Sequence, residues 1–136
     1  MDETEIKVTK EFLEKLIHSI RTIAGHYGME VQLAKLAEEA AEYAAAFTKI
    51  KVYETMISEG HNEGYCLDKR DKAIFEMLKE LADVLQVANE VQALMKEDPE
   101  FESLLYLLMD AKAKRQLKRI EEEKKYASQK KCRTNA

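Results

Sequence analysis

The sequence predicts an all-α protein, and three observations support this prediction. Its 136 residues include one proline and four glycines, and 35% of them are charged. Ala, Leu, Glu and Lys, which all favour helices, dominate the composition. Apolar residues recur at helical spacing over long stretches. The chain is long enough to bury a core, so we expect one domain over residues 1–120 and a polar, flexible C-terminal tail over residues 121–136.

The first two of four expected helices form the N-terminal half of the chain. The first helix begins after Thr9, which is a suitable N-cap residue, and ends between Gly25 and Gly28. The second runs from Met29 to about Met56, and a polar loop that contains glycines follows over residues 58–70. Four apolar residues are expected to form the core face of the first helix: Phe12, Leu16, Ile20 and Ile23.

The last two helices are expected on either side of the single proline. The third begins near Asp71, another candidate N-cap, and runs to about Lys96. Asp98 is expected to cap the fourth helix, with Pro99 at its first helical position. The fourth helix starts apolar and turns basic from Lys112 onward.

Composition also excludes several classes of protein. No apolar run approaches the roughly 18 residues of a membrane span, and the polar N-terminus does not resemble a signal peptide. Cys66 and Cys132, expected in the loop and the tail, suggest neither a disulfide framework nor a metal knuckle, so we expect a cytoplasmic protein. The net charge of −4 argues against nonspecific binding of nucleic acid.

Two acidic clusters interrupt helices that are otherwise apolar: Glu38-Glu39-x-x-Glu42 and Glu80-x-x-Asp83. Each helix carries one apolar stripe on the side away from its acids, and further apolar residues beside the acids themselves. A helix that is apolar on both sides is buried on both sides. Because one small chain can hardly cover both, we expect the long central helices to assemble into a dimeric or tetrameric helical bundle, that is, a homodimer or homotetramer. The stripe of the second helix comprises Leu33, Leu36, Ala37, Ala40, Ala44 and Phe47.

The acidic clusters favour a metal site. Carboxylates three residues apart lie side by side on a helix, and two such helices set antiparallel would bring four carboxylates together. A hard divalent cation would neutralise them, and Mg²⁺ or Mn²⁺ suits an all-carboxylate set. No loop has the pattern of a calcium-binding EF-hand. A di-iron site needs Glu-x-x-His on two helices, and none of the three histidines follows a Glu at that spacing.

These motifs resemble the all-α nucleoside triphosphate pyrophosphatases, which comprise the MazG-like proteins, the dimeric dUTPases and phosphoribosyl-ATP pyrophosphatase. "MEVQLAKLAEEAAEYAAAF" and "KELADVLQVANEV" are similar to the two central helices of that family, and "DAKAKRQLKRIEE" is similar to its later basic segment. The resemblance covers about Met29 to Glu122. One departure is the spacing from Glu42 to Glu80, which is longer than in the compact members of the family.

The resemblance implies a four-helix MazG-like protomer that cleaves nucleoside triphosphates into the monophosphate and pyrophosphate with Mg²⁺. It suggests removal of noncanonical or excess nucleotides, without indicating the base or the sugar. Which of Glu38 and Glu39 binds metal and which activates water is left open. The implied roles are Glu39, Glu42, Glu80 and Asp83 as metal ligands, Glu38 as the group that orients or deprotonates water, and Lys112 and Arg115 as phosphate-binding residues.

Two other classes of function compete with this interpretation. The basic C-terminal helix would suit a nucleic-acid-binding module, although Glu121 to Glu123 interrupt it. Alternatively, the acids would only fix the register of a noncatalytic helical interaction protein. The position of His26, Tyr27 and Gln32 near the start of the second helix would allow contacts to a base, but we expect core or surface roles for them.

Overall fold

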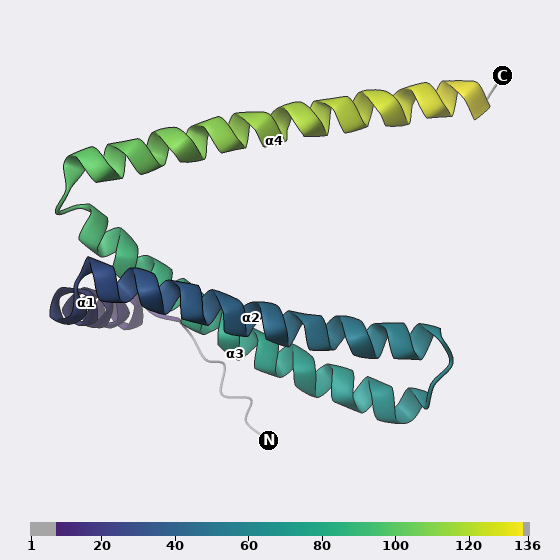
Figure 1. The fold of residues 1–136 in the computed structure, drawn as a ribbon, viewed down its shortest axis with the longest axis horizontal. Helices are drawn as coiled ribbons and strands as arrows, with labels where there is room; N and C mark the ends of the chain where they lie inside the picture. The colour runs from purple at the N-terminus through teal and green to yellow at the C-terminus, as the bar shows by residue number, and fades with distance from the viewer. Residues whose placement is uncertain (1–7, 135–136) are drawn as a thin grey trace. The chain divides into compact units, whose positions relative to one another are not determined.

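The structure, a computed structural model, describes residues 8–134 and is all-helical over them, which confirms the predicted fold class. The helices are α1 (Lys10–Tyr27), α2 (Met29–Ser58), α3 (Glu63–Met95) and α4 (Pro99–Thr134) (Figure 1). The chain divides into two compact units, Met1–Leu94 and Met95–Ala136, and each is described by itself. None of the helices in the described part has the length and apolarity that crossing a membrane requires.

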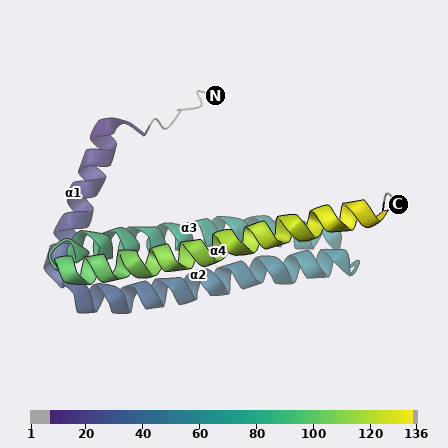
Figure 2. The same ribbon diagram turned by 90° about the horizontal axis from the view of Figure 1, so that it is seen from above.

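Helix α1 begins and ends as its local sequence predicts. The hydroxyl of Thr9 accepts a hydrogen bond of 3.1 Å from the backbone N–H of Phe12, which caps the first turn. Gly28 ends the helix with a φ of 83°, and its N–H donates to the carbonyl of Ala24 at 2.9 Å. Because residues with a Cβ rarely adopt this φ, glycine permits the sharp turn into α2. Figure 2 shows α1 standing across the end of the unit where α2 begins.

Helices α2 and α3 form a long antiparallel hairpin that closes at residues 59–62 (Figure 1). Gly60, with a φ of 80°, makes the turn, and the side chain of Asn62 accepts a hydrogen bond of 3.2 Å from the N–H of Tyr65. The expected start of the third helix at Asp71 was therefore wrong, because Asn62 caps the helix nine residues earlier. The expected loop over residues 58–70 is mostly helix, and Cys66 is fully buried within α3 instead of lying in a loop.

The burial pattern of α3 has the seven-residue period of two helices that pack along their length. The positions that follow this period are 66, 73, 80, 87 and 94, and Glu80, in the middle, is half-buried. The buried residues of α2 include Gln32 and Glu39, so the side of each helix that carries acids is the side that packs within the hairpin. The buried members of the α3 series are Cys66, Ala73, Val87 and Leu94.

The other apolar side of each hairpin helix is exposed. On α2, Leu33 and Phe47 are 43% and 41% exposed, although both belong to the apolar stripe that the sequence marks for burial. On α1, Ile20 is buried as predicted, but Phe12 and Leu16 of the expected core face are exposed. Within the described residues, the unit therefore leaves uncovered the second apolar surface that led us to expect a partner subunit. The exposed stripe of α3 comprises Phe75, Leu78 and Leu85.

The second unit consists mainly of helix α4. The carboxylate of Asp98 accepts a hydrogen bond of 3.2 Å from the N–H of Phe101, which confirms the predicted cap before Pro99. The helix continues to Thr134, so the expected helix end near residue 120 was wrong. The helix continues because no proline or glycine occurs after Pro99 to stop it. Residues 135–136 of the expected tail lie outside the described residues, and the division at residue 120 stays a prediction.

Candidate functional site

Three of the predicted metal ligands converge between α2 and α3. Glu39, Glu80 and Asp83 each offer a carboxylate oxygen within 4.8 Å of the others. Glu80 and Asp83 share one side of α3 because they are three residues apart. Glu39 reaches them from the antiparallel α2 and is only 7% exposed. The packing of the hairpin thus brings together acids that are 41 to 44 positions apart in the sequence.

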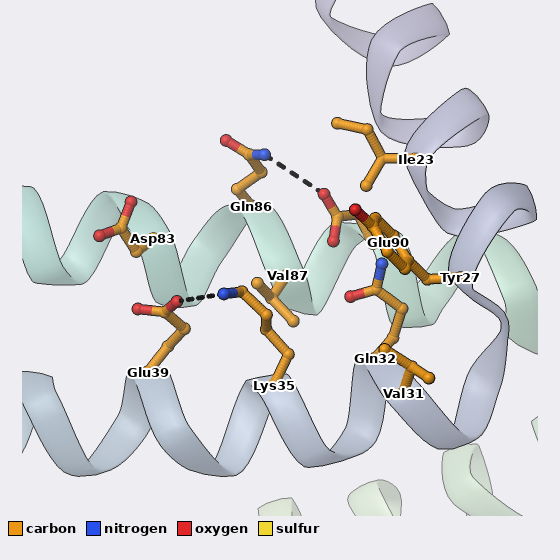
Figure 3. A pocket seen from close by; sticks show the side chains of 10 residues that line it. All are labelled: Ile23, Tyr27, Val31, Gln32, Lys35, Glu39, Asp83, Gln86, Val87 and Glu90. Carbon is orange, nitrogen blue, oxygen red and sulfur yellow. Dashed lines mark hydrogen bonds and ion pairs between the residues drawn. The ribbon is translucent and has the colours of Figure 1, made fainter.

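Two oxygens of this cluster lack a hydrogen-bond partner among the described residues. They are Oε2 of Glu39 and Oε2 of Glu80, and both are buried. The other oxygen of Glu39 lies 3.5 Å from Nζ of Lys35 (Figure 3). Burying an acceptor without a partner costs about 1–3 kcal/mol, and more when it is charged. The arrangement therefore leaves room for a cation or another donor at the cluster.

The negative charges of the cluster also act on their surroundings. The charge of Glu39, followed by desolvation and the charges of Glu80 and Glu38, raises the pKa of Glu42 above its usual value. The pKa of Lys35 is raised by its hydrogen bond to Glu39 and by the charges of Glu38 and Glu39. Glu42 thus belongs to the same electrostatic environment, although it is exposed and stands outside the group of three carboxylates.

Replacing Glu42 by Gln is expected to raise the melting temperature of the metal-free protein near neutral pH. The usual pKa of Glu42 is 4.5, and its folded-state pKa is higher. The folded state therefore binds the proton more tightly than the unfolded state, so ionised Glu42 destabilises the fold above its folded pKa. This destabilisation disappears as the pH falls through the folded pKa towards 4.5, and the advantage of Glu42→Gln should disappear with it.

Thermal unfolding in the presence of a chelator, measured between about pH 7 and pH 4, checks this expectation. Glu54→Gln is the matched control, because Glu54 lies on the same helix and pairs with Lys51 at 3.1 Å. An advantage of Glu42→Gln that is the same at every pH would show that charge repulsion is not its cause.

A cavity of about 410 Å³ opens beside the cluster, within the first unit (Figure 3). Glu39 and Asp83 lie at one end of it, and the buried side chains of Gln32 and Glu90 lie at the other. Aliphatic and aromatic side chains, with Lys35 and Gln86, complete the wall. Besides these four residues, the lining comprises Ile23, Tyr27, Val31, Lys35, Gln86 and Val87.

The polar end of the cavity was largely missed by sequence reasoning. The sequence favours core or surface roles for Gln32 and Tyr27, and it does not single out Glu90. A signal was nevertheless present, because Gln32 stands seven residues before Glu39 and Glu90 stands seven residues after Asp83. Seven residues are two helical turns, so each residue shares a helix face with one member of the acidic cluster.

A second hollow of about 410 Å³ lies on the other side of the cluster, where Glu42 and Glu80 form part of its wall. Three lysines also line this hollow, together with Glu76, so its lining holds as many acids as bases. Lys72 pairs with Asp68 at 3.2 Å, and Lys69 lies 5.6 Å from the ring centre of Tyr65. The third lysine is Lys49.

The remaining predicted site residues lie outside the group of three carboxylates. Glu38 is exposed on α2, next to Glu39 in the sequence. Lys112 and Arg115 are exposed on α4, in the second unit, and their expected role in binding phosphate stays a prediction. No model of a protein family matches this chain, and searches of curated proteins and of solved structures also produce no match.

Proposed function

We propose that this protein is an Mg²⁺-dependent nucleoside triphosphate pyrophosphohydrolase of the MazG-like type, active in the cytoplasm as a homo-oligomer. It would cleave a (deoxy)nucleoside triphosphate into the monophosphate and pyrophosphate, and so remove noncanonical or excess nucleotides. One observation carries the proposal: Glu39, Glu80 and Asp83 meet beside a cavity, and two of their buried oxygens have no partner among the described residues.

The donor set fits a hard divalent cation. All three groups are carboxylates, and their oxygens are close enough to bind the same ion. Glu42 extends the set, since its pKa is raised mainly by the charge of Glu39 and a cation would relieve that repulsion. When bound, Mg²⁺ would polarise the phosphoryl oxygens, lower the pKa of a water molecule and stabilise the leaving pyrophosphate.

The surrounding residues suit a triphosphate. Lys35 holds a positive charge at the cluster, and it could turn to the phosphates once a cation replaces it beside Glu39. Lys49, Lys69 and Lys72 line the hollow beside Glu42 and Glu80, together with Glu76, and are further candidates to contact a phosphate. Lys112 and Arg115 keep the phosphate-binding role that the resemblance implies. Glu38 would orient or deprotonate the attacking water, for which its exposed position beside Glu39 leaves access.

A purely structural role for the acids is the alternative, and the charge balance favours the proposal over it. Acids that fix helix register are expected to be paired with bases, because unpaired buried charges are costly. Among the described residues, Lys35 is the one cation within 4.0 Å of any of the three carboxylates. Nucleic-acid binding is a second alternative, because helix α4 is basic. A salt-dependent mobility shift of DNA or RNA with the protein would support it.

The test is a panel of the common dNTPs and NTPs with Mg²⁺ and with Mn²⁺, scored separately for pyrophosphate and for phosphate release. We expect pyrophosphate from at least one substrate, no release in chelator, and no inorganic phosphate as first product. Release of phosphate alone would indicate attack on the terminal phosphate and reject the proposed reaction. No turnover with any nucleotide would reject the enzyme.

A further inference from the structure

The end of the cavity away from the acidic cluster holds two buried polar side chains. Gln32 and Glu90 are each only 2% exposed, and both line the cavity. Figure 3 shows them facing one another from α2 and α3, beside the ring of Tyr27. The nearby wall is aliphatic, with Ile23 and Val31 among its residues. An apolar slot with a few converging polar groups is the usual form of a site that binds a planar organic ligand.

The hydrogen-bonding capacity of this end is unbalanced. An ionised carboxylate only accepts hydrogen bonds, and Oε1 of Glu90 receives one, from Nε2 of Gln86 at 3.2 Å. Oε1 of Gln32 is buried and has no partner among the described residues. A buried acceptor without a donor is costly, so a ligand that brings N–H groups would gain binding free energy here.

The spacing along the helices matches the proposed substrate. Glu90 lies seven residues beyond Asp83, and Gln32 lies seven residues before Glu39. Seven residues correspond to about 10 Å along a helix axis. This is comparable to the reach of a nucleotide from its α-phosphate, across the sugar, to the far edge of its base. A triphosphate held at the acidic cluster would therefore place its base between Gln32 and Glu90.

We propose that Glu90 and Gln32 select a nucleobase that carries an exocyclic amino group, namely adenine, cytosine or guanine, over uracil and thymine. The inference rests on the proposed function, which anchors the phosphates at the cluster. The pairing edges of adenine, cytosine and guanine all present an N–H₂ donor to the acceptors of the pocket. Uracil and thymine present one N–H between two carbonyl oxygens, and those oxygens would face the carboxylate of Glu90.

Equilibrium binding of non-hydrolysable α,β-imido analogues of dATP, dCTP, dGTP, dTTP and dUTP, measured by calorimetry with Mg²⁺, tests the inference on the full chain. We expect at least one analogue with an amino base to bind about tenfold or more tightly than both the dTTP and the dUTP analogues. Glu90→Gln keeps the shape of the side chain but replaces one acceptor by a donor. It should weaken binding of the preferred analogue about tenfold and improve binding of the dUTP analogue.

Glu54→Gln is the matched control, because Glu54 lies outside both cavities, and it should keep the wild-type preferences. Gln32→Met removes the second acceptor. It should also reduce the difference in affinity between the amino-base analogues and the dTTP and dUTP analogues. If Glu90→Gln does not fold, the wild-type panel and Gln32→Met still decide the question.

The outcomes separate this inference from the proposed function. Equal affinities for all five analogues, together with pyrophosphate release from the natural substrates, would overturn base selection and leave the enzyme standing. A preference for amino bases without any pyrophosphate release would support the pocket and reject the reaction. Tightest binding of the dUTP or dTTP analogue contradicts the inference directly, and no binding of any analogue rejects both proposals.

Discussion

Replacing Glu80 by Gln, or Asp83 by Asn, is expected to lower pyrophosphate release by about a hundredfold or more while the helical fold is kept. Each substitution removes one charged candidate metal ligand from the group of three carboxylates, whose oxygens lie within 4.8 Å of one another. Both replacements keep the size of the side chain. Loss of one of three crowded negative charges should also raise the melting temperature of the metal-free protein, because repulsion in the cluster falls.

Three measurements check this prediction together: pyrophosphate release, helical content by circular dichroism, and thermal scans with and without Mg²⁺. Mg²⁺ should raise the melting temperature of the wild type, since it binds the folded cluster. It should raise that of Glu80→Gln and Asp83→Asn much less. Glu54→Gln, on the same hairpin but paired with Lys51, should behave as the wild type in every respect.

The opposite pattern would identify a structural role for the acids. If Glu80→Gln and Asp83→Asn lower the melting temperature in chelator, and wild-type scans with and without Mg²⁺ superimpose, then the carboxylates stabilise the hairpin and do not bind the ion. Removing one partner of a structural buried ion pair is strongly destabilising, typically by about 3–5 kcal/mol. The direction of the shift therefore separates the two roles.

Introducing charge on the exposed apolar stripe of α3 is expected to dissociate the protein into monomers. Leu78 and Leu85 are seven residues apart and therefore lie on one face of α3. They are 50% and 55% exposed, so this face does not pack against α2 within the hairpin. A contiguous exposed apolar surface commonly marks an interaction site in soluble proteins. Full burial of an exposed leucine contributes about 1.5–3 kcal/mol, and roughly half of each of these side chains is left to bury, so replacing both by Glu should weaken association by orders of magnitude.

Light scattering coupled to size exclusion, at micromolar concentration, measures the effect. The wild type should have the mass of a dimer or tetramer, and the Leu78→Glu, Leu85→Glu double variant that of a monomer. Lys10→Glu is the control, because Lys10 is exposed on α1, away from the stripe of α3, and pairs with Glu14 at 4.0 Å. A monomeric wild type would overturn the expected assembly. An oligomeric double variant would place the interface on another surface.

The helices and several of their ends follow from local signals in the sequence. Thr9 and Asp98 were recognised as caps because a capping side chain interacts with residues only two or three positions away. The side-by-side placement of Glu80 and Asp83 follows in the same way from the helical period alone. The start of α3 was missed because Asn62 and Asp71 are both acceptable caps, and local preference does not choose between them. Burial of Cys66 inside the hairpin accompanies the earlier start.

The sequence by itself determined the fold class, the apolar character of both sides of the central helices, and the acids among which the candidate cation site is found. Only the tertiary structure decided which side packs inside the hairpin and which acids meet. The register between α2 and α3 brings Glu39 to Glu80 and Asp83, leaves Glu42 exposed outside this group, and places Gln32 opposite Glu90 in the cavity. The physical reason is that helix formation depends on neighbours within one or two turns, whereas register depends on the packing of side chains distant in sequence.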